Sequence, residues 1–334
     1  MWKNLALAAI AKETETTSPT IASSLPHLDP ANSEELDLKT LPPLDASKCP
    51  GFKLANGPGS TYGTTARVFN QDSFDAAITM PSSVLSIPPT NSGKPTQAVE
   101  TQIFEHLESA TASGCGVEYG IRTQPRGGWL KGTSAQEEAL CFRSTLAASL
   151  HRNLYPIQDR TGLYTRDVVV FRESMSDGHK LMIPGTAMTD LPIVSALTVA
   201  GIRRPDVKPI GEEAAATGND TTVETKGPFV FADPAARDLT KDKMRLCLRM
   251  AGAKGHTMLV LGAIGCGAFG NPPEEVAKCW MEVLSEVEFA GGWFKEIWFA
   301  VYDRTNEGNF EIFTEAFDGK VVGELQAFKP PTES

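Results

Sequence analysis

Hydrophobic and polar positions divide the chain into short apolar runs and longer segments with one apolar face. Runs bounded by turn-forming residues predict strands at 66–70, 76–80, 84–88, 117–122, 168–171, 193–200, 258–264 and 296–303. Apolar residues that recur every three or four positions predict helices at 96–109, 134–150, 234–251, 272–287 and 310–317. Because strands alternate with helices, we expect an α/β sheet that is covered on both faces.

Two stretches are predicted to lack regular structure. Residues 14–65 are dense in Ser, Thr, Pro and Gly, which predicts an irregular arm. Residues 209–227 contain almost no large apolar side chain, which predicts a solvated surface insertion. We therefore divide the chain into an N-terminal helix and arm over 1–65 and one α/β domain over 66–330.

Composition is that of an ordinary globular protein. Of the 334 residues, 41% are hydrophobic and 22% are charged, and no apolar run reaches the roughly 18 residues that span a bilayer. The apolar run at 5–11 is followed by Lys12, Glu13 and Glu15, where a signal peptide would carry small uncharged residues. We interpret this run as one face of a short helix.

Charge and cysteine usage exclude several classes of protein. The 31 basic and 41 acidic residues give a net charge of −10, which disfavours binding to duplex nucleic acid but leaves room for a local anion pocket. The six cysteines include no C-x-x-C pair and the five histidines show no ligand spacing, so we expect no metal site. We expect reduced thiols in an intracellular protein, cytoplasmic or nuclear, with no membrane partner.

A glycine-rich loop follows the apolar run 258–264. Asn271 is expected to cap the next helix, with Pro272 at its first position and Glu274 completing a capping box. Glycines allow close approach of the backbone, and the N–H groups of a helix start attract anions. The loop therefore predicts a diphosphate site, although a tight turn without a ligand has the same sequence; its residues are Gly265, Cys266, Gly267, Ala268, Phe269, Gly270 and Asn271.

Other roles for this loop are less consistent with the sequence. A Rossmann dehydrogenase needs an acidic residue about 20 positions further on and several later strands. Here the next strand ends at Asp303, and only 31 residues follow it. Cys266 has apolar neighbours and no nearby histidine, which disfavours a nucleophile. Phe269 is a candidate to stack on a ribose or base, or else is buried.

A second motif places two acids in the first turn of a predicted helix. The turn Gly127-Gly128 leads into Gln136-Glu137-Glu138. Ser134 and Glu137 fit a capping box, so a structural role explains Glu137. Glu138 lies about 100° further round the helix and is not needed for that box. It is either a solvated first-turn acid or a general acid that protonates the leaving oxygen of a glycosidic bond.

Together, the two motifs resemble the microbial-type poly(ADP-ribose) glycohydrolases, a branch of the macrodomain fold. Residues 132–146 resemble the signature helix of that family, and the segments 167–172 and 256–317 are similar to its later part. The resemblance implies a three-layer α/β/α fold with a mixed sheet, preceded here by an N-terminal extension. It also implies hydrolysis of the ribosyl bond of ADP-ribose chains, free or on modified proteins, without a metal or other cofactor.

Carried over by position, the resemblance assigns a role to each matched residue. Glu138 is implied as the catalytic acid, with Glu137 orienting a ribose hydroxyl and Gln136 supporting the turn. Gly127 and Gly128 would approach the distal ribose. The loop from Gly265 to Asn271 would hold the diphosphate.

The chain departs from the family at the glycine turn. Arg126 stands where the family has the first of three glycines, Trp129 replaces an aliphatic residue, and the preceding segment 119–125 offers no asparagine. These differences keep two alternatives open. One is a module that binds ADP-ribose with weak or no hydrolysis, and the other is a hydrolase of a different ADP-ribosyl adduct.

Overall fold

The computed structural model describes residues 4–54, 61–80, 103–104, 125, 128–133, 136–210, 228–304 and 306–326. Its strands form two four-stranded sheets and one short hairpin. The first sheet has the order β1-β4-β5-β3, with bounds Glu34–Asp37, Thr161–Val169, Ile193–Thr198 and Ile103–Phe104. The second has the order β10-β2-β9-β8, with bounds Val321–Gln326, Thr61–Phe69, Glu296–Ala300 and Met258–Leu261. The hairpin pairs β6 (Val207–Pro209) with β7 (Phe229–Phe231).

Both sheets contain parallel and antiparallel pairs. Strand β9 lies parallel to β2 and to β8, and β10 is antiparallel to β2. Strand β5 is parallel to β3 and antiparallel to β4. The described strands therefore have the mixed pattern that the resemblance implies.

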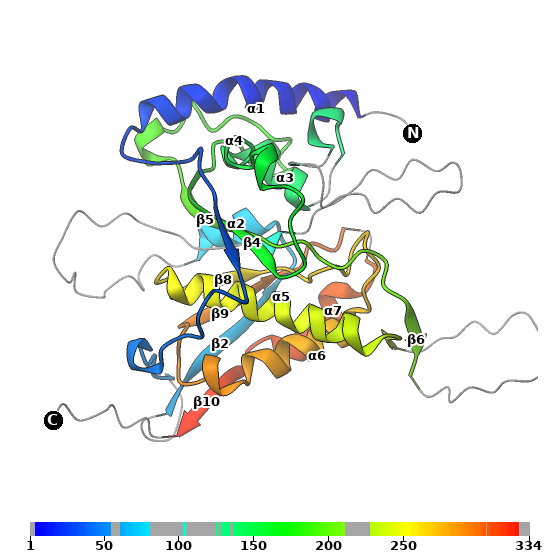
Figure 1. The fold of residues 1–334 in the computed structure, drawn as a ribbon. Coiled ribbons are helices and arrows are strands. Elements are labelled where there is room, and N and C mark those ends of the chain that lie inside the picture. The colour runs from blue at the N-terminus through cyan, green and yellow to red at the C-terminus, as the bar shows by residue number, and fades with distance from the viewer. Residues whose placement is uncertain are drawn as a thin grey trace, which may run out of the picture.

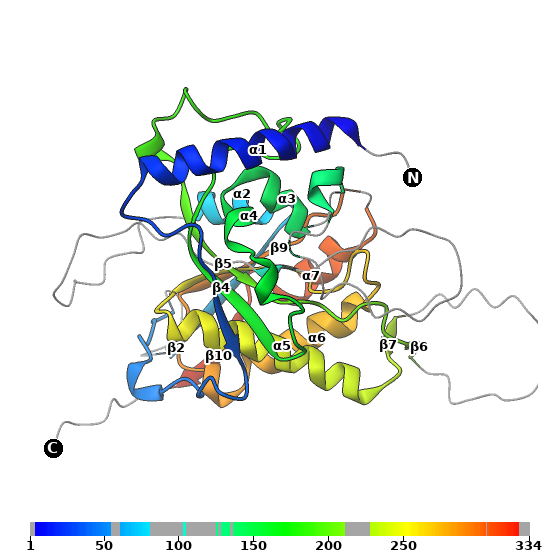
Figure 2. The same cartoon turned by 45° about the horizontal axis from the view of Figure 1, so that its top comes forward.

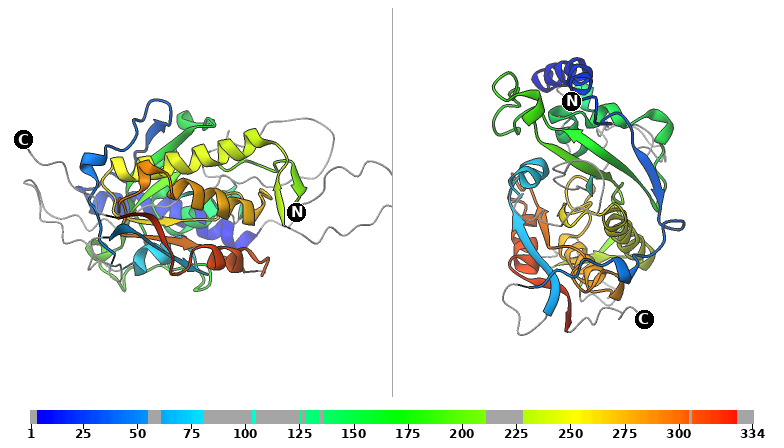
Figure 3. Two further views of the ribbon diagram at one scale, coloured as in Figure 1. Left: turned by 90° about the horizontal axis from the view of Figure 1, so that it is seen from below. Right: turned by 90° about the vertical axis from the view of Figure 1, so that its left-hand side faces the viewer.

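Helices cover the two faces of these strands. Helices α1 (Leu5–Ser24), α3 (Gln136–Arg143) and α4 (Leu146–Ser149) lie at the top in Figure 1, and α5 (Pro234–Ala253) and α6 (Pro273–Leu284) lie in the lower half. Figure 2 shows α1 lying across α3 and α4. Figure 3 shows α5 and α6 side by side. The short α2 (Ser73–Thr79) joins the first group in its core, and α7 (Asn309–Phe317) joins the second.

Alternate residues of β8 and β9 point to opposite cores. Leu259 and Phe299 belong to the cluster formed with α5, α6 and α7, whereas Val260 and Trp298 belong to the cluster formed with α1 to α4. A strand buried on both faces reads as a continuous apolar run, which is how both strands were predicted. The predicted three-layer α/β/α arrangement is therefore confirmed.

The N-terminal helix is longer than expected. Helix α1 continues through Ser24, well into the stretch predicted to be irregular. Its polar composition is compatible with a helix because Thr14 and Ser18 are buried on its inner face: Thr14 Oγ1 donates to Phe142 O at 2.8 Å, and Ser18 Oγ donates to Thr14 O. The boundary between an N-terminal unit and the main domain stays a prediction.

Two predicted elements are wrong in type. Residues 76–79 belong to α2 and Met80 is its C-cap, so the segment is not a strand; the carboxylate of Asp72 caps that helix by accepting from Phe74 N and Asp75 N. Within the segment predicted as a helix at 96–109, the only two described residues form strand β3. Of the other predictions, 84–88 and 117–122 lie outside the described residues, as does most of the insertion, from 211 to 227.

The predicted helix 134–150 is broken into α3 and α4. At the break, Thr145 N donates to Val169 O and Val169 N donates to Thr145 Oγ1, each at 3.0 Å. The backbone thus pairs with the end of β4 in place of a helical turn. Among the described residues, no helix is both long and apolar enough to cross a membrane.

Candidate active site

A cavity of about 650 Å³ lies at the carboxyl ends of three parallel strands. The segments that follow β2, β8 and β9 all contribute to its wall, as do α3 and the loop after β4. Ligands of α/β sheets bind at this edge because the loops there bring distant residues together. The described lining residues include Asn70, Asp72, Ser73, Asp75, Gln136, Ala139, Ser174, Ser176, Cys266, Gly267, Ala268, Tyr302, Asp303, Arg304 and Asn309.

The glycine loop and the acidic helix meet at this cavity. Gln136, the first residue of α3, lines it together with Cys266, Gly267 and Ala268. Gln136 also packs against Gly262, where an added Cβ would lie 3.0 Å from Gln136 Nε2. The two sequence motifs, far apart in the chain, therefore form one site.

Asn271 closes the glycine loop and does not cap α6. Its side chain donates to Ile202 O at 2.6 Å and to Gly265 O at 3.0 Å, and the N-cap residue of α6 is Pro272. The predicted capping box is therefore wrong. Gly265 has a φ of +76°, and a Cβ there would lie 2.2 Å from Asn271 Nδ2, so only glycine fits.

Gly267 is the open point of the loop. A Cβ on Gly267 would have no neighbour within 4 Å, and the residue lines the cavity. Cys266 is buried and its Sγ lies 3.7 Å from Ile264 O. Phe269 is also buried, with its ring close to Gly201, and is not among the described lining residues. The part of the loop that faces the cavity is thus 266–268.

Both glutamates are fully buried in the first turn of α3. Glu138 Oε1 accepts from Gly128 N at 3.1 Å and from Thr133 Oγ1 at 3.0 Å. Glu138 is therefore not a solvated first-turn acid. A Cβ on Gly128 would lie 2.6 Å from Thr133 Oγ1, so this close arrangement requires glycine. Among the described residues, Glu137 and Glu138 do not line the cavity, and Gly127 lies outside the described residues.

The 3₁₀ turn Trp129–Lys131 connects the glycine turn to the core. Trp129 is buried, with its ring 6.0 Å from that of Phe142. Gly132 follows with a φ of +80°, and an added Cβ would lie 2.3 Å from Asn4 O, the residue that caps α1. The bulk of Trp129 is thus accommodated inside the protein, and α1 packs directly against the turn.

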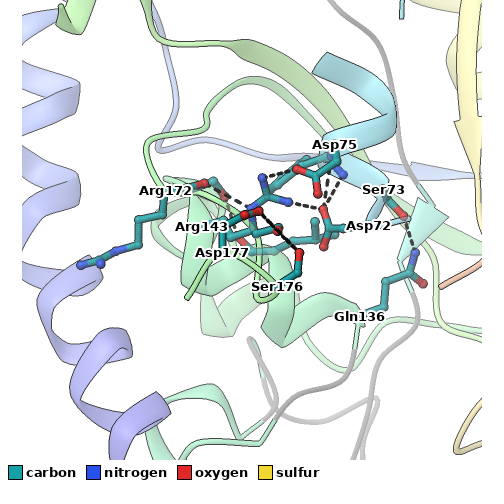
Figure 4. Close-up of polar contacts among 12 residues, drawn as sticks. Asp72, Ser73, Asp75, Gln136, Arg143, Arg172, Ser176 and Asp177 are labelled. Carbon is teal, nitrogen blue, oxygen red and sulfur yellow. Dashed lines mark hydrogen bonds and ion pairs between the residues drawn. The ribbon is translucent and has the colours of Figure 1, made fainter. Parts of the chain in front are cut away.

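Sequence reasoning missed the start of α2. Ser73 Oγ accepts a hydrogen bond from Gln136 Nε2 at 3.0 Å, and Asp72 and Asp75 line the same wall (Figure 4). The signal was present in Asp72, a typical capping residue directly after a strand. The apolar residues that follow it suggested a second strand and obscured the cap.

A buried arginine joins α3 to this wall. Arg143, the last residue of α3, pairs through Nη1 with Asp72 and through Nη2 with Asp75 Oδ1 at 2.6 Å (Figure 4). Its Nε donates to Arg172 O at 3.2 Å. Burial raises the pKa of Asp75, and the Arg143 guanidinium opposes that rise.

Two further loops contribute to the cavity lining. One contains Ser174 and Ser176, and is anchored by Arg172, whose Nη1 donates to His179 O at 2.9 Å. The other contains Asp303, whose carboxylate accepts from the backbone N–H groups of 307, 308 and 309 at the start of α7. Burial alone would raise the pKa of Asp303, but these N–H donors lower it below its usual value.

Comparison with known proteins agrees with the motifs. Residues 96–174 match the family model of the microbial-type PARG (poly(ADP-ribose) glycohydrolase) catalytic domain. The predicted family resemblance is confirmed. The matched PARG segment contains the glycine turn, the buried glutamates and Arg143. No curated protein matches the chain.

Solved PARG structures share the fold. A PARG from Thermomonospora curvata is 22% identical with a TM-score of 0.59, and the match covers 94% of this chain and 100% of that one. The same enzyme bound to the inhibitor ADP-HPD gives 23% and 0.58 with the same coverage. A PARG from Deinococcus radiodurans in complex with ADP-ribose gives 21% and 0.53, covering 85% of this chain and 93% of that one. At these identities, the likeness establishes the fold.

Proposed function

We propose that this chain is a glycohydrolase of the poly(ADP-ribose) type, with Glu138 as its general acid. One observation carries the proposal. Gln136, which begins the Gln136-Glu137-Glu138 turn of the PARG-like segment, packs beside Gly262 and lines a single cavity together with residues 266–268 of the glycine loop. A catalytic helix beside a phosphate-binding loop is the arrangement that holds a ribose bond against a carboxyl group.

The diphosphate of the substrate is assigned to the loop 265–271. Backbone N–H groups of the loop attract an anion, and the open space at Gly267 admits one close to the backbone. The Deinococcus relative binds ADP-ribose and the Thermomonospora relative binds ADP-HPD, which supports an ADP-ribosyl ligand here. The distal ribose would then lie toward Gly127 and Gly128.

Hydrolysis breaks the bond between C1″ of the ribose and the leaving oxygen. In the proposed reaction, Glu138 gives its proton to that oxygen as an oxocarbenium-like centre develops on the ribose. Water then adds to C1″ and returns a proton to the Glu138 carboxylate. Gly128 N and Thr133 Oγ1 hold the carboxyl group in place, and Glu137 is assigned to a ribose hydroxyl.

A binding module is the second candidate. It is favoured by the burial of both glutamates and by their absence from the described cavity lining. For catalysis, the substrate must reach Glu138 past the glycine turn, where Arg126 replaces a family glycine. The third candidate, a hydrolase of a different ADP-ribosyl adduct on a protein or nucleic acid, is favoured by the same replacement.

One experiment separates these candidates. Purified protein is incubated with poly(ADP-ribose) and, in parallel, with an ADP-ribosylated protein and an ADP-ribosylated oligonucleotide, and free ADP-ribose is followed by chromatography. Release from the polymer is the expected result. Release from an adduct alone would select the third candidate. Binding of ADP-ribose without release from any substrate would select the module.

A further inference from the structure

We propose that Arg143 is a positioning residue for this site and acts on the catalytic helix through Asp72, Ser73 and Gln136. The inference rests on the proposed function and deepens it. Arg143 itself is not among the described residues that line the cavity, whereas the other three are. Its effect on a bound ligand must therefore pass through them.

The guanidinium of Arg143 satisfies three acceptors in different directions. Its side chain is 2% exposed and contacts Asp72, Asp75 and the carbonyl oxygen of Arg172. A planar guanidinium has five N–H donors in a fixed geometry, so it can fix the relative positions of several partners. A lysine ammonium is a single point of contact and cannot reach all three acceptors at these positions.

Asp72 transmits this constraint to the next residue. Its Oδ1 accepts from Phe74 N at 2.8 Å and from Asp75 N at 3.4 Å while it pairs with Arg143. The same atom thus caps α2 and binds the arginine. Because Ser73 lies within this capped turn, its hydroxyl is held where it accepts from Gln136 Nε2 at 3.0 Å.

Helix α3 is consequently tied to α2 at both ends. Gln136 is its first residue and Arg143 its last, and both bind the first turn of α2 (Figure 4). Glu138 lies between these two attachments, so loss of either one allows the acidic turn to shift. A displacement of about 1 Å can lower a reaction rate roughly 100-fold.

Arg143 also balances the charge of this wall. Burial raises the pKa of Asp75 and the nearby Asp72 carboxylate adds to that rise, and both acids line a cavity assigned to an anionic ligand. The guanidinium is buried behind them, and its single positive charge offsets part of their combined negative charge without occupying the cavity. Its removal would leave two acids facing a diphosphate.

A double-mutant cycle tests the proposal. Arg143→Lys, Ser73→Ala and the double variant are compared with wild type in release of ADP-ribose from poly(ADP-ribose), with KM and kcat measured separately. We expect Arg143→Lys to lower kcat by about 10-fold to 100-fold with a smaller change in KM. We also expect the double variant to be little slower than Arg143→Lys alone, because both changes break one path. Fully additive losses, or wild-type kcat in Arg143→Lys, would overturn the proposal.

A control accounts for lost stability. Val283→Ala truncates a buried side chain of α6 that does not line the cavity. The kcat values of this variant and of Arg143→Lys are measured at temperatures equally far below the melting temperature of each. An equal loss of kcat in this variant would overturn the proposal. If Arg143→Lys does not fold, Asp72→Asn takes its place in the cycle, because asparagine keeps the helix cap but lacks the charge.

The same proteins distinguish this inference from the proposed function. If wild-type protein releases no ADP-ribose, the proposed function fails. The double-mutant cycle is then measured as the Kd of each variant for ADP-ribose, by calorimetry. Non-additive weakening of binding is then the expected result. Additive changes, or unchanged Kd values, would overturn the role of Arg143 by themselves.

Discussion

The backbone N–H of Gly128 donates to Glu138 Oε1 across 3.1 Å, so the glycine turn and the acidic helix hold each other. Thr133 Oγ1 donates to the same oxygen at 3.0 Å. One carboxyl oxygen is thereby fixed by two donors from the turn. If Glu138 transfers a proton, the orientation of its carboxyl group depends on the hydrogen bonds from both Gly128 N and Thr133 Oγ1.

Replacement of Thr133 tests this dependence. Thr133→Ala removes one of the two donors, and we expect kcat to fall about 2-fold to 10-fold because a hydrogen bond to a neutral, protonated carboxyl group contributes on the order of 0.5–1.5 kcal/mol. Thr133→Ser keeps the hydroxyl and serves as the control. The measurement is the rate of ADP-ribose release at saturating polymer. Equal rates in the two variants would show that the hydroxyl does not orient Glu138.

Two alanine substitutions in the glycine loop separate binding from stability. Gly267→Ala places a methyl group in open space beside the cavity, and we expect the Kd for ADP-ribose to rise at least about tenfold, with unfolding free energy within roughly 0.5 kcal/mol of wild type. Gly270→Ala also meets no neighbour but has a φ of +67°, so it should destabilise the protein by about 1–2 kcal/mol. Calorimetry and denaturant unfolding measure both quantities. Unchanged affinity in Gly267→Ala would contradict the assignment of the diphosphate.

The contact between α1 and the glycine turn has its own test. Gly132→Ala combines a φ of +80° with a clash against Asn4 O, whereas Gly255→Ala has the same φ and open space. We expect about 1–2 kcal/mol of destabilisation in Gly255→Ala and clearly more in Gly132→Ala. Only Gly132→Ala should also lower kcat, because it displaces the turn that holds Glu138. Equal unfolding free energies would show that α1 does not press on the turn.

Stability should depend on pH through an ion pair between α5 and α6. Glu282 pairs with Arg237 at 2.6 Å and Lys241 at 3.0 Å, and the hydrogen bond from Arg237 lowers the pKa of Glu282 from 4.5 to about 2. Between these values, the unfolded state binds more protons than the folded state, so stability falls as pH decreases through that range. Denaturant unfolding between pH 2 and pH 6 measures it. We expect Glu282→Gln to lose less stability than wild type over the same interval; identical curves would exclude this pair as the cause.

The sequence alone was sufficient to predict the helices and strands whose hydrophobic pattern is clear within the segment itself. Strands β8 and β9 are apolar on both faces, and α5 to α7 follow regular helical spacing, so each was predicted close to its observed bounds. The segment 76–80 was misread because its apolar residues are compatible with a strand, and the cap supplied by Asp72 decides for a helix. At the N-terminus, contacts with α3 and with Arg172, which follows β4, stabilise a helix that composition alone disfavours.

The two sequence motifs of the site could be predicted, but the residues that hold them in position could not. Gln136 and the glycine loop could be paired because both motifs carry recognisable chemistry. The role of Arg143 could not be predicted, because its partners Asp72 and Asp75 lie 71 and 68 positions away in the chain. Nothing in the local sequence indicates which acids a buried arginine will meet.

The central claim is that Glu138 supplies the proton that releases ADP-ribose. The most direct measurement compares Glu138→Gln with wild type in the rate of ADP-ribose release from poly(ADP-ribose), with ADP-ribose affinity measured on the same preparations. We predict a rate at least about 100-fold lower and a Kd within a few-fold of wild type, because glutamine keeps the shape of the side chain but cannot donate that proton. A Glu138→Gln protein that still releases ADP-ribose at a rate near that of wild type would contradict the account.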